Sequence, residues 1–302
     1  MKIRKVLIPA DFSPPSSLAL NYGIALARRF RAKLLLLHVL EPATALLYTF
    51  PTEAERVQQH RLQQAYRLLQ ALVGPEDRDD LDLKVLVRSG GIDDEIASAV
   101  QEEGADIVVM GTHGRRILGK WLVGSVTQNV LRKLHVPVLT VCRASRPLDF
   151  KRILFATDLA DHAKSGFPFI LDLARILNAD IVVTHVLEGR PPLSLETAAI
   201  AEEVETWRHR TRDNALVDLA ELKGADQRNG VGVETLLLEG SAQYEILKAA
   251  KDNDADLIVI SAREMGFLER AFGTTAEFLI HEADVPVLSI PDSLNATSYA
   301  GC

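Results

Sequence analysis

The strongest constraint on this chain is an internal repeat, because its 302 residues contain one pattern twice. Residues 6–41 align with residues 153–188 at an offset of 147 positions, which places Asp11 opposite Asp158. The same offset matches His38 with His185. Later parts align at an offset of 150, which matches Gly90 with Gly240 and Asp106 with Asp256, and then at 149, which matches Gly124 with Gly273. A duplication of this length predicts two domains of similar fold, at residues 1–145 and 150–302.

Each repeat alternates short apolar runs with amphipathic segments. In the first repeat the apolar runs predict strands at 5–8, 33–39, 83–87, 107–110 and 136–141. The amphipathic segments predict helices at 16–31, 52–73, 93–103 and 125–134. This alternation indicates an α/β domain with a five-stranded parallel sheet and helices on both faces. Because ligands of such domains bind beyond the carboxyl ends of the strands, the segments that follow strands form the candidate site.

Composition excludes several classes of protein. The apolar fraction of 47% and the charged fraction of 25% are typical of globular chains, and the net charge of -7 argues against general binding to nucleic acid or anionic membranes. The longest apolar runs, such as 34–37, are too short to span a membrane. Pro9 and Asp11 break the first apolar run, so no secretion signal is visible, and two cysteines suit a reducing compartment. We therefore expect a cytoplasmic protein.

Residues 110–126, MGTHGRRILGKWLVGSV, are unusual because they contain four glycines and several basic residues but no acidic one. Gly111 and Gly114 follow a predicted strand, and Gly124 with Ser125 begins a predicted helix. Glycine allows backbone amides to approach an anion closely, and the amino end of a helix adds free N–H groups and a positive dipole end. The pattern therefore predicts a phosphate site in this connection.

Two better-known phosphate loops fit this stretch poorly. Residues 114–120 match GxxxxGK, but Trp121 stands where a Walker A loop needs the serine or threonine that binds magnesium. The dinucleotide fingerprint GxGxxG is missing after the first strand, where residues 9–11 read Pro-Ala-Asp. We find no metal-ligand spacing of His or Cys and no nucleophile signature, so we assign no metal-binding or catalytic residue.

The spacing G-2x-G-9x-G-S, read here as GTHGRRILGKWLVGS, resembles that of the ATP-binding branch of the universal stress protein family. Three further landmarks of that family occur in register: Pro-x-Asp at 9–11, His-Val at 38–39 and Val-Pro-Val at 136–138. The resemblance covers nearly the whole chain, twice over. It implies two tandem Rossmann-like domains, similar in fold to adenine nucleotide alpha hydrolases, with ATP and Mg²⁺ as ligands and a stress-response or regulatory role.

The resemblance also implies a role for each matched residue. The residues that would line the adenine and ribose side are Pro9, Asp11, Val39, Met110 and Gly111. Those that would surround the phosphates are His113, Gly114, Gly124, Ser125 and Val126.

Simpler interpretations of the same residues stay open. Asp11 also suits the cap of the following helix, and Gly124 with Ser125 also suits an ordinary helix start. His38 fits a packed histidine at a strand end better than a metal ligand. The basic residues of the glycine stretch fit a solvated loop face, or a screen for phosphate charge; they are Arg115, Arg116 and Lys120.

The second repeat departs from the pattern at this connection. Residues 261–264 read Ser-Ala-Arg-Glu where the first repeat has Gly-Thr-His-Gly, and one residue is lost between 260 and 273. Both glycines are gone, and Glu264 introduces a carboxylate near the position of a phosphate. Because like charges repel and a stiffer backbone approaches an anion less closely, we expect this half to bind no ATP, or a different ligand.

These observations favour a nucleotide-binding regulatory protein with one ATP site per chain over an efficient enzyme. The alternatives are a slow ATPase, or a module that binds a non-nucleotide ligand or protein partner through the second domain. The strands at 136–141 and 285–290 should lie at sheet edges, where Pro137 and Pro286 are tolerated. The resemblance implies that these strands pair the two domains as a pseudo-dimer within the chain, and it leaves a homodimer open.

Overall fold

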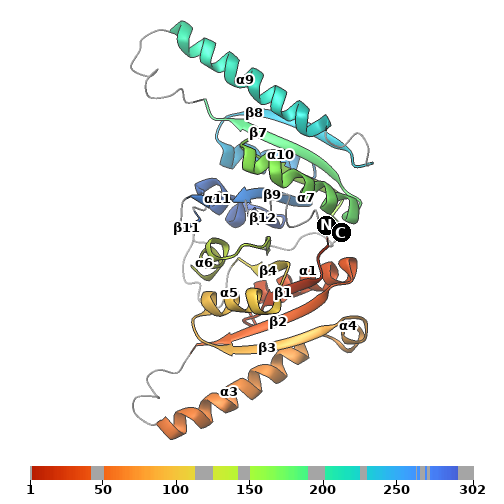
Figure 1. Ribbon diagram of the computed structural model, residues 1–302, viewed down its shortest axis with the longest axis vertical. Coiled ribbons are helices and arrows are strands. Elements are labelled where there is room, and N and C mark those ends of the chain that lie inside the picture. Colours follow the sequence, from red (N-terminus) through yellow and green to blue (C-terminus); the bar gives the residue numbers. More distant parts are fainter. Residues whose placement is uncertain are drawn as a thin grey trace.

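The computed structural model describes residues 2–41, 51–112, 125–141, 150–189, 201–224, 230–262, 264–265, 269–270 and 273–291. Of residues 51–54, 162, 201–203, 262, 264–265 and 269–270 it describes the backbone only. Two halves of similar build are stacked along the long axis, the first at the bottom and the second at the top of Figure 1. The long helices α3 (Pro51–Leu72) and α9 (Ala201–Gly224) lie at the two far ends.

Each half contains a five-stranded parallel sheet, as the repeat predicts. The strands of the first half are β1 (Lys5–Pro9), β2 (Lys33–Leu40), β3 (Leu83–Ser89), β4 (Ile107–Gly111) and β5 (Val138–Val141), in the order β3-β2-β1-β4-β5. Those of the second half are β6 (Arg152–Ala156), β7 (Asp180–Leu187), β8 (Val233–Glu239), β9 (Leu257–Ala262) and β12 (Val287–Pro291), in the order β12-β9-β6-β7-β8. Because the strand order reverses beside β1 and β6, each half has a switch point there, where α/β domains bind ligands.

Helices cover both faces of each sheet. The remaining helices are α1 (Pro14–Phe30), α4 (Pro75–Asp80), α5 (Ile92–Glu103), α6 (Ser125–Lys133), α7 (Asp161–Leu177), α10 (Ala242–Asp252) and α11 (Thr274–Glu282). One core contains side chains of α1, α3, α7 and α9, and the other contains side chains of α5, α6, α10 and α11. Successive residues of a strand face opposite cores, so Val6 and Ile8 lie in the first core and Leu7 lies in the second.

Matched aspartates begin the first strand of each half in the same way. Asp106 Oδ2 accepts hydrogen bonds from the backbone N–H groups of Arg4 and Lys5, at 2.7 and 2.9 Å. Asp256 Oδ2 accepts the corresponding bonds from Lys151 and Arg152, at 2.9 and 3.0 Å. The pairing of Asp106 with Asp256 in the sequence repeat therefore has a structural reason in both halves.

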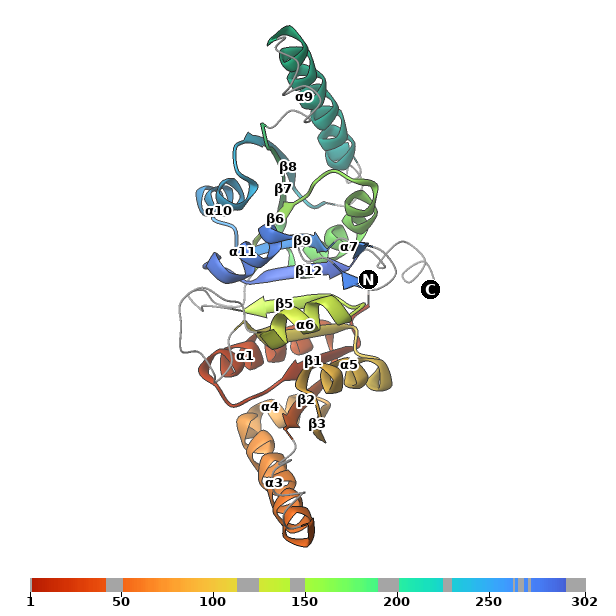
Figure 2. The same ribbon diagram turned by 90° about the vertical axis from the view of Figure 1, so that its left-hand side faces the viewer.

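β5 and β12 join the two sheets into one sheet of ten strands. They pair antiparallel, with Leu139 opposite Leu288, and Figure 2 shows their arrows side by side in opposite directions. The hydroxyl of Thr140 donates a further hydrogen bond across this junction, to the carbonyl of Val287 at 3.0 Å. Each strand is thus the last of its own half and lies at the centre of the joined sheet.

The prediction that these two strands lie at sheet edges is therefore wrong for the joined sheet. Pro137 and Pro286 stand immediately before the strands, which begin at the next residue. Their carbonyl oxygens accept hydrogen bonds from the N–H groups of Val108 and Ile258, both at 3.0 Å. Proline fits here because the position just before a strand needs its carbonyl for pairing but not an N–H donor.

Candidate functional site

The candidate residues of the first half converge on one edge of its sheet. β1 pairs with β2 on one side and with β4 on the other, so the carboxyl ends of all three strands are neighbours. Pro9 ends β1, Val39 lies near the end of β2, and Met110 and Gly111 end β4. The N–H of Ala10 donates to the carbonyl of Leu37 at 2.7 Å, which extends the pairing of β1 with β2 into the candidate site.

Asp11 braces the start of α1. One oxygen of its carboxylate accepts from the N–H of Ser13 at 3.0 Å and from the Ser13 hydroxyl at 2.5 Å. The Ser13 oxygen in turn accepts from the N–H of Ser16 at 3.3 Å, so Ser13 is the N-cap and Asp11 holds it in place. The interpretation of Asp11 as the cap itself is therefore wrong, because the cap is Ser13.

The second half repeats this bend with different side chains. Asp158 accepts from the N–H of Ala160 at 3.1 Å, and the residue after each aspartate has a left-handed backbone, with φ of 63° at Phe12 and 60° at Leu159. Left-handed backbone is unfavourable for such bulky side chains, by roughly 1–2 kcal/mol per residue. Its occurrence in both halves shows that the sharp turn after the first strand belongs to the duplicated fold.

The histidines His38 and His185 link strand ends. His38 Nδ1 lies 2.6 Å from the carbonyl oxygen of Ala10, and His185 Nδ1 lies 2.8 Å from that of Thr157. Because a carbonyl only accepts, each Nδ1 carries the hydrogen and donates it. Among the described residues no group of three or more His, Cys, Asp or Glu side chains is arranged to hold a metal. The strand-end interpretation of these histidines is confirmed.

Gly111 is required for packing between β4 and α1. A Cβ on Gly111 would lie 2.8 Å from the carbonyl carbon and 2.9 Å from the carbonyl oxygen of Pro15, in the first turn of α1. Backbone atoms cannot move aside as a flexible side chain can, so any side chain here would push α1 away from β4. The sequence pattern attributed Gly111 to close approach of a phosphate, whereas the described contact is with α1.

Thr127 links the start of α6 to the end of β4, and the sequence pattern does not single it out. Its hydroxyl lies 3.3 Å from the carbonyl oxygen of Gly111 and 3.5 Å from that of Thr112, and both threonines are buried. The available signal was a threonine in the first turn of a predicted helix, two residues after Ser125. This contact holds the amino end of α6 beside the strand ends.

The amino end of α6 has the chemistry of an anion site. Ser125 is its first residue and is exposed, Val126 is half-buried, and the first turn contains no acidic residue. The free N–H groups and dipole of this end favour a negative ligand. His113, Gly114 and Gly124 lie outside the described residues, so their part in the site stays a prediction, as does that of the basic residues at 115, 116 and 120.

An ion-pair cluster holds α6 against α5. The ammonium of Lys133, in the last turn of α6, donates to Asp93 and Asp94 in the first turn of α5. Burial alone would raise the pKa of Asp93, but the hydrogen bonds and charge of Lys133 outweigh it and lower this pKa. The same contacts raise the pKa of Lys133.

These pKa shifts give the cluster a pH dependence. Because the pKa of Asp93 is lower in the folded chain, its contribution to stability is complete above the ordinary aspartate pKa and is lost as pH falls below about 4. Lys133→Met should therefore reduce the free energy of unfolding near neutral pH by less than about 1 kcal/mol, since the cluster is largely exposed. Urea unfolding of both proteins should show the difference shrinking toward about pH 3. A difference that stays constant with pH would contradict this origin.

The second half has a different connection at the corresponding position. Ser261 and Ala262 end β9, and the connection to α11 contains two short strands that pair antiparallel, β10 (Glu264–Met265) and β11 (Glu269–Arg270). The sequence pattern does not predict this pair of strands. The side chain of Glu264 lies outside the described residues, so its carboxylate stays a predicted obstacle to phosphate.

Among the helices that the structure describes, none combines the length and the apolar composition needed to cross a membrane.

Comparison with known proteins identifies the family. The model of the universal stress protein family matches residues 2–141 and 149–291. A universal stress protein of Mycolicibacterium smegmatis is 22% identical over 94% of this chain and 96% of its own length. One of Methanocaldococcus jannaschii is 30% identical over 46% of this chain and 95% of its own length.

A solved structure has the same architecture throughout. The universal stress protein of Archaeoglobus fulgidus aligns with a TM-score of 0.69 over 98% of both chains, at 18% sequence identity. At this identity the likeness concerns the fold alone. With the family match over both repeats, the chain belongs to the universal stress protein family and contains two tandem copies of its domain.

Proposed function

We propose that the first half of this chain binds ATP, with Mg²⁺, at a single site per chain, and that the protein has a nucleotide-dependent regulatory role in the stress response. The observation that carries the proposal is where the glycine motif ends. The motif G-2x-G-9x-G-S finishes at Ser125, which is the first residue of α6, and Thr127 holds that helix end beside the carboxyl end of β4.

The residues present fit the two parts of a nucleotide. The phosphates would be held at the acid-free start of α6 by Ser125, Val126 and the glycines of the connection, where amides and the helix dipole favour negative charge. The ribose hydroxyls have an acceptor in Asp11, and the apolar wall for adenine comes from Pro9, Val39 and Met110. When bound, ATP would bring the negative charge of its phosphates to the site, together with the Mg²⁺ that accompanies them. The chain's own residues orient the nucleotide and replace its hydration.

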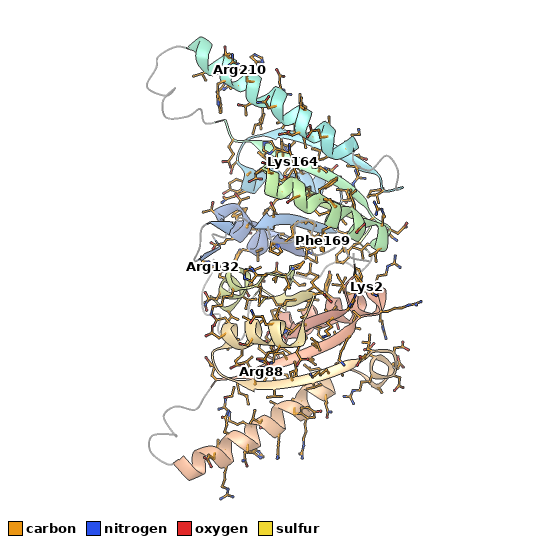
Figure 3. The ribbon with its side chains drawn as sticks, viewed as in Figure 1. Lys2, Arg88, Arg132, Lys164, Phe169 and Arg210 are labelled. Atoms are coloured by element: carbon orange, nitrogen blue, oxygen red, sulfur yellow. The ribbon has the colours of Figure 1, made fainter. Side chains whose placement is uncertain are left out.

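We also propose that the two halves act as an intramolecular pseudo-dimer. The antiparallel pairing of β5 with β12 supports this, together with two contacts between side chains and the other half. Arg29 Nε donates to the carbonyl of Ile176 at 2.7 Å, and Arg132 lies 3.6 Å from the carboxylate of Glu277. Arg132 lies at the boundary between the halves in Figure 3.

The low cysteine content suits a cytoplasmic location for such a protein.

The content of bound nucleotide tests this proposal directly. The purified chain is denatured by heat, the released small molecules are separated by ion-exchange chromatography, and nucleotide is counted per chain. We expect about one ATP per chain, from the site in the first half. Two would contradict the expectation that the second half holds no ATP, and none after incubation with ATP and Mg²⁺ would overturn the ATP site itself. Phosphate release over many turnovers would identify the protein as an ATPase.

A further inference from the structure

The second half contains a large pocket at the edge where its strands end. Its volume is about 1260 Å³, and its lining comes from the ends of β6, β7 and β9 and from α9, α10 and α11. In Figure 1 this edge lies on the left of the upper half, where α9 begins and α11 faces the sheet. The pocket thus lies in the half whose glycine motif is lost.

Several apolar side chains line this pocket, together with one buried hydroxyl that has no described partner. The apolar lining residues include Ala156, Val186, Ile246, Ile260 and Leu279. Thr184, on β7, also lines the pocket, is 1% exposed, and its hydroxyl has no hydrogen-bond partner within the described part of the chain. The matched residue of the first half is Leu37, which lies in the apolar core. A buried hydroxyl without a partner reduces stability, so a bound molecule that pairs with it offsets that loss.

The charged lining residues favour a ligand that donates hydrogen bonds. Of those that the structure describes, four are carboxylates and two are guanidinium groups, namely Asp158, Glu188, Glu205 and Glu239 against Arg208 and Arg212. Each arginine is paired with one of these carboxylates, since Arg212 donates to Glu239 and Arg208 lies 3.1 Å from Glu205. Asp158 and Glu188 accept from the backbone N–H groups of Ala160 and Ala242, so the described lining carries an excess of two negative charges. Carboxylate oxygens accept from hydroxyl and amino groups and repel phosphates at short range.

The amino end of α11 also lines the pocket, through Thr274 and Thr275. By itself this helix end would attract an anion. The carboxylates around the same pocket oppose a polyanion, whereas a neutral molecule with hydroxyl groups can use both the N–H groups and the carboxylates. Trp207, on α9, adds an aromatic surface for a ring.

We propose that this pocket binds a neutral, nucleoside-sized molecule with an apolar ring and several hydroxyl or amino groups, and that it rejects polyphosphates. The ring would contact the apolar lining and Trp207, and a polar group of the ligand would pair with the Thr184 hydroxyl. This site lies in the other half from the ATP site and does not depend on it.

Adenosine and ATP are matched probes, because they differ only in the phosphates. The chain has two tryptophans, Trp121 and Trp207, so the variant Trp121→Phe leaves Trp207 as the single reporter in the pocket. In this variant we expect adenosine to change the tryptophan emission in a saturable manner, and ATP at the same concentrations to leave it unchanged. The absence of a saturable response to adenosine, or an equal response to ATP, would overturn the proposal.

A second substitution tests the role of the hydroxyl. Adding Thr184→Val should raise the dissociation constant for adenosine about threefold to tenfold, the range for one lost hydrogen bond. It should leave the melting temperature unchanged or higher, because the hydroxyl it removes has no described partner. Ser289→Ala is the matched control, since Ser289 has another buried hydroxyl without a described partner and is not among the described lining residues. Equal effects of the two substitutions on adenosine binding would also overturn the proposal.

Discussion

Gly114→Asp is expected to lower the affinity of the chain for ATP with Mg²⁺ at least about 100-fold, because at the proposed site it would place a carboxylate beside the phosphates. Like charges in contact cost several kcal/mol, and each 1.4 kcal/mol corresponds to roughly a tenfold change in affinity. The second repeat has the same chemistry naturally, with Glu264 at the matched position. Isothermal titration calorimetry with ATP and Mg²⁺ measures the effect.

Gly224→Asp is the control for added charge. Gly224 ends α9, and a Cβ there would meet no atom within 4 Å. We expect this variant to bind ATP like the unmodified chain. Far-UV circular dichroism should show the same helix content for all three proteins. Unchanged ATP affinity in Gly114→Asp would overturn the proposed phosphate site, whereas the proposal for the pocket of the second half would be unaffected by that result.

The strands and most helices are predictable because their signals are local. The apolar runs predict the first strand at 5–8 and the fourth at 107–110, and the structure has Lys5–Pro9 and Ile107–Gly111. Parallel strands buried on both faces are continuous apolar runs, so their ends are visible in the sequence. The first helix begins at Pro14, two residues before the amphipathic segment at 16–31, and Pro14-Pro15 after Ser13 is the sequence signal for that start, because proline fits the first turn, where no N–H is needed.

The contacts that hold the site together are not local, so the sequence pattern does not predict them. Nothing near Gly111 in the sequence indicates that Pro15 lies against it, and the Thr127 bond to β4 depends on the placement of α6. Thr184 follows three buried apolar residues of β7 and resembles an ordinary strand residue. Its significance depends on which groups surround it, and those come from other strands and helices.

The position of β5 and β12 shows the same limit at the level of the sheet. Each repeat alone predicts a last strand with one unpaired edge. Only the joined structure shows that the two last strands cover each other, and an unpaired edge is a template for association that proteins usually protect. The duplication within one chain thus supplies the partner for both edges.

Leu288→Asp should produce the largest loss of stability among these variants, because it places a carboxylate in the buried junction between the halves. Leu288 is 2% exposed and faces Leu139, which is also 2% exposed. An unpaired buried charge reduces the free energy of unfolding by about 3–5 kcal/mol. Leu216→Asp is the control, because Leu216 lies on α9 with 47% of its surface exposed and should change stability by less than about 0.5 kcal/mol. Urea unfolding followed by circular dichroism compares the two.

The double variant Leu139→Ala/Leu288→Ala separates loss of the junction from damage within one half. Residues directly opposite each other on paired strands have Cβ atoms about 5 Å apart, so each alanine removes the contact that the other would also remove. The two effects should therefore fall short of additive by at least about 0.5 kcal/mol, the usual sign of residues in contact. Strict additivity would mean that the two leucines stabilise only their own halves. If the double variant loses less stability than the sum of the two single variants, the pairing of β5 with β12 stabilises the chain as one unit, which is what a pseudo-dimer requires.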